Sequence, residues 1–200
     1  MQKYDKLNNS NLIIKNNARK DEIKAYFLLK DILLNDKNVI VGDDIANKLP
    51  DIYSEDKKIG IEVTSLEHIA EFIKEKYNLS YKKPSKNYKD IVDYYENLSL
   101  KDKNILFNNE FEILLEKKMK KKTNYASCEN ISLIIISDNE KKPYIRRESL
   151  VEIYRKLCIK YNKKYDNLFF YYNDTLYVNI YNDFVKIKKF NFNKGEDLWR

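Results

Sequence analysis

The sequence predicts an α/β fold in which helices flank a mixed central β-sheet and the C-terminal part is rich in strands. Three observations predict this class. Residues 18–34 repeat apolar side chains at helical spacing. Residues 131–137, ISLIIIS, form an apolar run typical of a strand that is buried on both faces. Residues 167–192 contain three apolar and aromatic runs separated by turn residues. This order of elements is typical of a layered sandwich.

The first predicted helix begins near Ala18, with Asn16 and Asn17 as candidate capping residues. Its buried stripe is expected to contain Ile23, Tyr26, Phe27, Leu29, Leu33 and Leu34. Glu22 lies next to this stripe. It is either a first-turn acid favoured by the helix dipole or part of a functional site, and the sequence leaves both open.

A β-hairpin is predicted over residues 49–65, LPDIYSEDKKIGIEVTS, because turn-forming residues at 54–57 separate two strand-like runs. A brief strand or turn precedes it at residues 38–42. Asp51 follows a proline at the start of the hairpin, and Glu62 lies eleven positions later in an alternating apolar strand. If the hairpin is short, both carboxylates face one cleft. Asp43 and Asp44 are weaker candidates because neither has a paired strand with a downstream acid.

The middle of the chain predicts further helices. A helical pattern covers residues 66–77 and places His68, the only histidine, beside its apolar face, where a local hydrogen bond is a more ordinary role than catalysis. Residues 78–104 mix lysine and tyrosine and are expected to form a helical insertion. A long helix is then predicted over residues 105–122.

The last third of the chain predicts a helix followed by strands. The helix covers residues 148–161 and is introduced by Pro143. The strand-like runs are separated by Asn-Asp pairs at residues 173–174 and 182–183, which are strong turn signals.

Length and composition favour one domain over residues 1–200, since 43% hydrophobic residues are enough for a core and no composition break divides the chain. No apolar run approaches the roughly 18 residues that span a bilayer, and the N-terminus lacks a secretion signal, so a cytoplasmic protein is expected. Cys128 and Cys158 lack the spacing of a zinc site or disulfide framework and are expected to be buried thiols.

The net charge of +7 favours a polyanionic partner. Part of this charge is compositional, because lysine, asparagine, isoleucine and tyrosine are all abundant, as in proteins from AT-rich bacterial genomes. A lysine run such as residues 117–122 is more often a solvated helix face than a binding surface, unless it lies beside a functional site.

Asp51 and Glu62 are the best candidates for metal ligands. Hard divalent cations such as Mg²⁺ take oxygen ligands, usually one or two carboxylates with water and substrate phosphate. The sequence therefore predicts Mg²⁺ or Mn²⁺ as the cofactor.

This layout resembles the core of the PD-(D/E)XK nuclease superfamily, in which an acid after a proline and an acid on the next strand hold a metal ion. The resemblance covers roughly residues 18–137 and implies a restriction-endonuclease-like sandwich. It implies that Asp51, Glu62 and the backbone carbonyl of Val63 ligate the metal, and that Glu22 is an additional catalytic acid. The chain departs from the pattern at Thr64, where the superfamily has lysine.

A lysine from elsewhere in the chain is expected to replace the missing one, as happens within the superfamily. Lys118 is the first candidate, because it follows Leu114 by four positions and Phe111 by seven and so lies at the edge of the apolar face of its helix. Lys121 is the next candidate. Lys117, Lys121 and Lys122 are expected to contact nucleic acid.

The resulting hypothesis is a metal-dependent endonuclease or exonuclease that cleaves DNA, with RNA as the less favoured substrate, in a bacterial mobile-element or defence context. The alternative is a catalytically impaired protein of the same fold that binds nucleic acid or protein as an immunity or regulatory module, which the threonine at position 64 favours. A further alternative is a surface hairpin without a site, in which Asp51 caps a turn and Glu62 is an outward-facing strand residue. A protein partner or a homodimer is left open, as is a toxin domain with the same chemistry.

Overall fold

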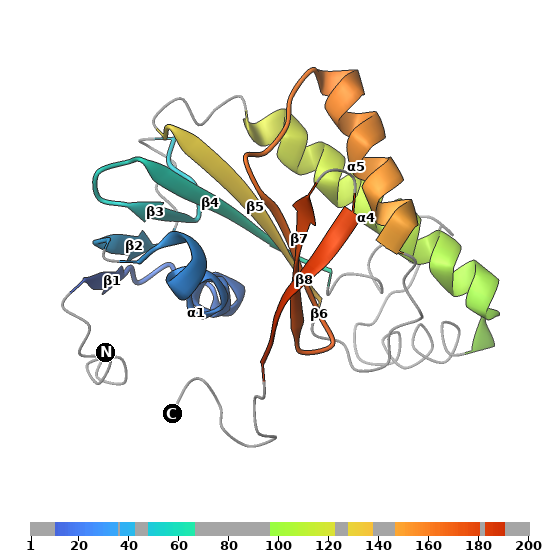
Figure 1. Ribbon diagram of the computed structural model, residues 1–200, viewed down its shortest axis with the longest axis horizontal. Coiled ribbons are helices and arrows are strands. Elements are labelled where there is room, and N and C mark those ends of the chain that lie inside the picture. The colour runs from blue at the N-terminus through green and yellow to red at the C-terminus, as the bar shows by residue number, and fades with distance from the viewer. Residues whose placement is uncertain are drawn as a thin grey trace, which may run out of the picture.

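The computed structural model describes residues 11–35, 37–42, 48–66, 97–122, 128–137, 147–180 and 183–190. In this part of the chain, eight strands form one mixed sheet, and three helices cover its two faces (Figure 1). The helices are α1 (Lys20–Leu33), α4 (Leu100–Lys122) and α5 (Arg147–Tyr161). The strands are β1 (Leu12–Ile14), β2 (Val39–Val41), β3 (Ile52–Ser54), β4 (Ile59–Ser65), β5 (Asn130–Ser137), β6 (Leu168–Tyr172), β7 (Thr175–Ile180) and β8 (Asp183–Lys189).

The strands follow one another across the sheet in chain order, from β1 to β8. The pairs β1–β2, β4–β5 and β5–β6 are parallel, and the other pairs are antiparallel. The prediction of an α/β fold with a mixed sheet between helices and a strand-rich C-terminal part is therefore confirmed.

The side chains of β5 alternate between two hydrophobic cores, one on each face of the sheet. Ile134 and Ile136 pack in the core beneath α1, whereas Leu133 and Ile135 pack in the core beneath α4 and α5. All four are almost fully buried. The run ISLIIIS is thus a central strand, as its lack of polar alternation predicts.

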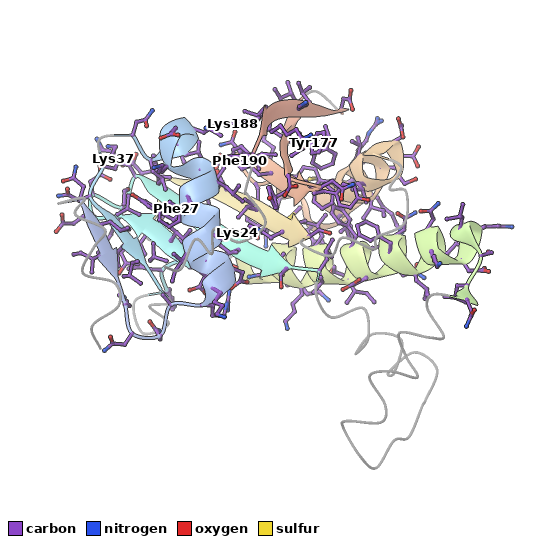
Figure 2. The ribbon with its side chains drawn as sticks, turned by 90° about the horizontal axis from the view of Figure 1, so that it is seen from below. Lys24, Phe27, Lys37, Tyr177, Lys188 and Phe190 are labelled. Atoms are coloured by element: carbon purple, nitrogen blue, oxygen red, sulfur yellow. The ribbon has the colours of Figure 1, made fainter. Side chains whose placement is uncertain are left out.

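Helix α1 covers one face of the sheet. Ile23, Tyr26 and Leu29 belong to its buried side, together with Ala25 and Leu28. Figure 2 shows Lys24 and Phe27 on this helix, with Lys188 and Phe190 near its C-terminal end, where Lys188 Nζ lies 3.6 Å from Asp31 Oδ2.

Two helix starts differ from the sequence prediction. Helix α1 begins at Lys20, with Arg19 as its N-cap, rather than at Ala18 after an asparagine cap, because Arg19 has an extended backbone and Glu22 accepts its N–H. Helix α4 begins at Leu100 rather than at residue 105, so residues 100–104 do not belong to a separate insertion. Ser99 is the N-cap of α4: its Oγ accepts the N–H of Asp102 and donates to the carboxylate of the same residue.

The C-terminal strands confirm the turn signal at residues 173–174. Asn173 and Asp174 both have positive φ, 47° and 54°, which matches the tight turn between β6 and β7. Strand β1 was not predicted. It has only three apolar residues and is a strand because it pairs in parallel with β2.

Several sequence predictions fall outside the described residues: Asp43, Asp44, His68, Pro143, Asn182 and the whole segment 67–96. The two cysteines are half-buried rather than buried, and neither forms a disulfide. No helix in the described part of the chain is long and apolar enough to cross a membrane.

Candidate active site

The β3–β4 hairpin places Asp51 opposite Glu62. Ile52 pairs with Ile61 in the antiparallel register, so the residues just before and just after this pair face each other. Asp51 lies outside the regular strand, and its backbone carbonyl accepts the N–H of Gly42 at 2.8 Å. The hairpin prediction is confirmed, and the two acids converge as their spacing predicted.

Val63 presents both of its backbone polar groups on the side where β3 has stopped pairing. The N–H donates to Asp51 Oδ2 at 2.7 Å, and the carbonyl accepts from Lys118 Nζ at 2.8 Å. A residue in a parallel or antiparallel ladder directs its N–H and C=O to the same neighbouring strand. Because β3 is short, side chains rather than a strand partner satisfy both groups of Val63.

Lys118 reaches the hairpin from α4. Phe111, Leu115 and Met119 are fully buried and fix the helix on the sheet. The lysine lies at the edge of this buried stripe, where the sequence placed it. Its Nζ donates to Glu62 Oε2 at 2.5 Å and lies 3.6 Å from Asp51 Oδ2.

Tyr165 holds the same turn of α4. Its hydroxyl donates to the backbone carbonyl of Lys118 at 2.8 Å. Burial raises the pKa of this phenol above its usual value, and the negative charge of Glu62 adds to the effect. Tyr165 therefore remains a neutral donor at any ordinary pH.

Glu22 enters the site from α1 through Arg19. The Nη2 of Arg19 lies 2.8 Å from Glu22 Oε1 and 3.7 Å from Asp51 Oδ2. The backbone N–H of Arg19 also donates to Glu22 Oε2 at 2.9 Å. Glu22 is thus near the predicted site. It is linked to Asp51 through Arg19, whose side chain contacts both carboxylates and whose backbone N–H donates to Glu22.

Five charged side chains consequently alternate in sign: Glu22, Arg19, Asp51, Lys118 and Glu62. We call this set the charged network. The three carboxylates are 0–1% exposed, Lys118 is 13% exposed and Arg19 is 49% exposed.

This burial excludes one alternative and corrects one expectation. Glu62 does not point to water, because β4 has α4 packed over the face that Glu62 occupies. The carboxylates also do not line an open, solvent-reachable cleft, since two cations lie against them.

Comparison of the chain with protein-family models, curated proteins and solved structures finds no match. The geometry of the charged network is therefore the basis for any functional conclusion.

The donor set fits a hard divalent cation. Asp51 Oδ2, Glu62 Oε2 and Val63 O all lie within 2.5–3.6 Å of one positive charge, the ammonium of Lys118. Two carboxylates and a carbonyl are oxygen ligands of the kind that Mg²⁺ and Mn²⁺ take. The described residues contain no ready-made group of three His, Cys, Asp or Glu side chains, so water and phosphate would have to complete the shell.

The remaining predicted residues are placed only in part. Lys117 is exposed on α4 next to Lys118. The side chains of Lys121 and Lys122 lie outside the described part of the chain. Thr64 stands two positions after Glu62 on β4 and pairs with Ile135. Strand β4 contains no lysine, so the ammonium beside Glu62 comes from α4.

Sequence analysis missed Arg19 and Tyr165. Arg19 left one signal, because it lies three positions before Glu22, as a capping-box partner does, and is one of only five arginines among 38 basic residues. Tyr165 left none, since it is one of 17 tyrosines.

Proposed function

We propose that the chain is a Mg²⁺- or Mn²⁺-dependent nuclease of the PD-(D/E)XK type that hydrolyses phosphodiester bonds in DNA, with RNA as the less favoured substrate. One observation carries the proposal: oxygens of Asp51, Glu62 and Val63 converge on one cation, Lys118 Nζ, at 3.6, 2.5 and 2.8 Å. The α1–hairpin–β5 order and the position of Lys118 support the same superfamily core.

Asp51, Glu62 and the carbonyl of Val63 would hold the metal. A divalent ion there polarises the phosphate and acidifies a bound water. Lys118 occupies the convergence point in the structure, so it must move aside for a metal to bind. From the edge of the site it would then donate hydrogen bonds to the attacking water or to the phosphate oxygens, which offsets the growing negative charge. Tyr165 keeps the turn that bears this lysine in place.

The binding-module alternative is supported by a different aspect of the same contacts. Every carboxylate of the charged network has a cation within 4 Å, so the network can serve stability alone. In that case substitution of a carboxylate changes stability without affecting any reaction.

The test is cleavage of linear duplex DNA, single-stranded DNA and structured RNA by wild type and by Asp51→Asn, Glu62→Gln and Lys118→Met. Each reaction contains MgCl₂, MnCl₂ or EDTA. Loss of a metal ligand is expected to lower the rate on the order of 10² or more, because the metal supplies several kcal/mol. Lys117→Met is the matched control, since this exposed lysine neighbours Lys118 on the same helix.

Circular dichroism verifies that each variant is folded, and the unfolding midpoint with and without MnCl₂ reports metal binding. Equal activity in wild type and Glu62→Gln would indicate a contaminating nuclease. Absence of cleavage on all three substrates with both metals would favour the binding module.

A further inference from the structure

We propose that Arg19 is a phosphate-binding residue: it neutralises Glu22 and Asp51 in the metal-free protein and transfers its outer N–H groups to a substrate phosphate when a metal occupies the site. This inference rests on the proposed function and assigns a substrate contact to a residue outside the PD-(D/E)XK motif.

Exposure distinguishes Arg19 from the rest of the charged network. Its side chain is 49% exposed, whereas those of Glu22 and Asp51 are 0% and 1% exposed. One side of the guanidinium therefore lies against the buried carboxylates, and the other side reaches solvent, where a nucleic acid would approach.

The backbone of Arg19 is held by a hydrogen bond, while its side chain is half exposed. The N–H is held by Glu22 Oε2 at 2.9 Å, and the residue is the N-cap of α1. The guanidinium lies 2.8 Å from Glu22 Oε1, 3.2 Å from Asp21 Oδ1 through its Nε, and 3.7 Å from Asp51 Oδ2. The contact to Asp51 is the longest of the three, so it is the one that an approaching ligand can replace.

Asp51 couples Arg19 to the metal. Its Oδ2 already accepts the Val63 N–H and faces both Arg19 and Lys118. With a divalent cation bound at Asp51, the guanidinium of Arg19 would be repelled and would turn its donors outward, where a phosphate drawn to the same cation would accept them.

The chemistry of the side chain suits this role. A guanidinium is a planar fork with five donors that matches two phosphate oxygens at once, whereas an ammonium acts as a point charge. Burial alone lowers the pKa of Arg19, but the charges of Asp21, Asp51 and Glu22 together raise it above its usual value. The group is therefore cationic throughout the working pH range.

The experiment measures binding of a fluorescein-labelled DNA oligonucleotide by anisotropy in CaCl₂, since Ca²⁺ also takes oxygen ligands. It compares wild type, Arg19→Met, Arg19→Lys and Arg155→Met, which removes the same charge from an exposed position on α5. Arg19→Met is expected to weaken binding about tenfold or more and to reduce the log–log salt slope by about 1. Arg19→Lys should recover only part of the affinity, because it keeps the charge and loses the fork.

Metal binding provides the second readout. The shift of the unfolding midpoint caused by MnCl₂ should persist in Arg19→Met, because Arg19 is not a ligand. Equal affinity and salt slope in Arg19→Met and Arg155→Met would overturn the proposal, and so would full recovery in Arg19→Lys. If Arg19→Met does not fold, the DNA affinity of Arg19→Lys is compared with that of wild type, and equal affinity would overturn the proposal.

The outcomes separate this inference from the proposed function. DNA binding that depends on Arg19, without cleavage by wild type, would support the phosphate contact and refute the nuclease. Cleavage by wild type, together with an unchanged DNA affinity in Arg19→Met, would support the nuclease and refute the phosphate contact. Absence of DNA binding by wild type would overturn both.

Discussion

Lys118 occupies the centre of the charged network, between Asp51 and Glu62. Its ammonium lies near three oxygens that belong to β4 and to the residue before β3. Without it, Asp51 and Glu62 would lose the ammonium that lies 3.6 Å and 2.5 Å from their carboxylate oxygens. Buried ion pairs contribute little net stability, but removal of one partner is strongly destabilising because a charge stays buried without compensation.

Lys118→Met is therefore expected to destabilise the metal-free protein by about 3 kcal/mol. Addition of MnCl₂ should restore part of this loss, since a divalent cation at the same oxygens replaces the missing charge. Urea unfolding with and without metal measures both effects. Lys117→Met, which changes an exposed neighbour, should unfold like wild type, and equal stability of the two variants would contradict the account.

The sequence could predict the members of the site whose positions follow from local patterns. Asp51 and Glu62 follow from a short hairpin, and Lys118 follows from the edge of an amphipathic stripe. Arg19 could not be predicted as a neighbour of Asp51, because that contact depends on how α1 sits against a hairpin more than 30 residues away. The burial of the carboxylates has the same cause, since it results from packing between elements.

At the scale of elements, Gly60 fixes the hairpin against the chain that precedes it. A Cβ at this position would lie 2.6 Å from Pro50 Cγ and 3.0 Å from Cys128 Sγ. Pro50 directly precedes Asp51, so a shift of this proline also moves the carboxylate.

Gly60→Ala is accordingly expected to destabilise the protein by about 1–3 kcal/mol through overpacking and to weaken Mn²⁺ binding. Urea unfolding and the metal-induced shift of its midpoint measure the two effects. The double variant with Cys128→Ala should recover only part of the stability, because the contact with Pro50 remains. Full recovery would show that the thiol alone restricts this position.

Helices α4 and α5 are joined by ion pairs along their exposed side. Lys156 Nζ lies 2.8 Å from Glu112 Oε1, and Lys160 Nζ lies 2.7 Å from Glu116 Oε1. The hydrogen bonds from Lys160 and Tyr161 lower the pKa of Glu116 from 4.5 to about 2. A lowered pKa means that the folded state favours the ionised carboxylate.

The contribution of Glu116 to stability should therefore be complete above about pH 4.5 and disappear as the pH falls toward 2. The difference in urea midpoint between wild type and Glu116→Gln, measured from pH 7 to pH 2, is expected to shrink over this window. Lys160→Met removes the largest cause of the shift and should flatten the same dependence. A difference that stays constant with pH would exclude this ion pair as its source.

Elements with a strong local pattern were predictable, whereas those defined by a neighbour were not. The apolar run of β5 and the Asn173–Asp174 turn could be recognised from the sequence alone. The three residues of β1 form a strand only because β2 lies beside them. The start of α4 was predictable in principle from Ser99 as an N-cap, but the first residues of this helix are mostly polar and show no apolar periodicity.

On the scale of the whole molecule, the net charge of +7 acts on any polyanion. Binding of nucleic acid releases counterions, so affinity depends on salt as well as on specific contacts. Lysines such as Lys117 would contribute to this general attraction, whereas under the proposed function Arg19 and Lys118 would lie at the reacting phosphate.

Affinity for a DNA oligonucleotide in CaCl₂ is expected to fall at least about tenfold between about 50 and about 200 mM salt. Anisotropy titrations at four salt concentrations measure the slope. Lys117→Met should lower this slope slightly without changing the MnCl₂-induced shift of the unfolding midpoint. An affinity independent of salt would show that the positive charge does not face the ligand.

The charged network joins Arg19 near the N-terminus to Lys118 on α4, nearly one hundred residues later. During translation, the ribosome must therefore extend the chain past α4, and the helix must settle on the sheet, before the five side chains can meet. Under the proposed function, a nascent chain that carries only Asp51 and Glu62 has no ammonium to assist the reaction. The proposed reaction would thus gain its lysine only after α4 has been synthesised and has packed against the sheet.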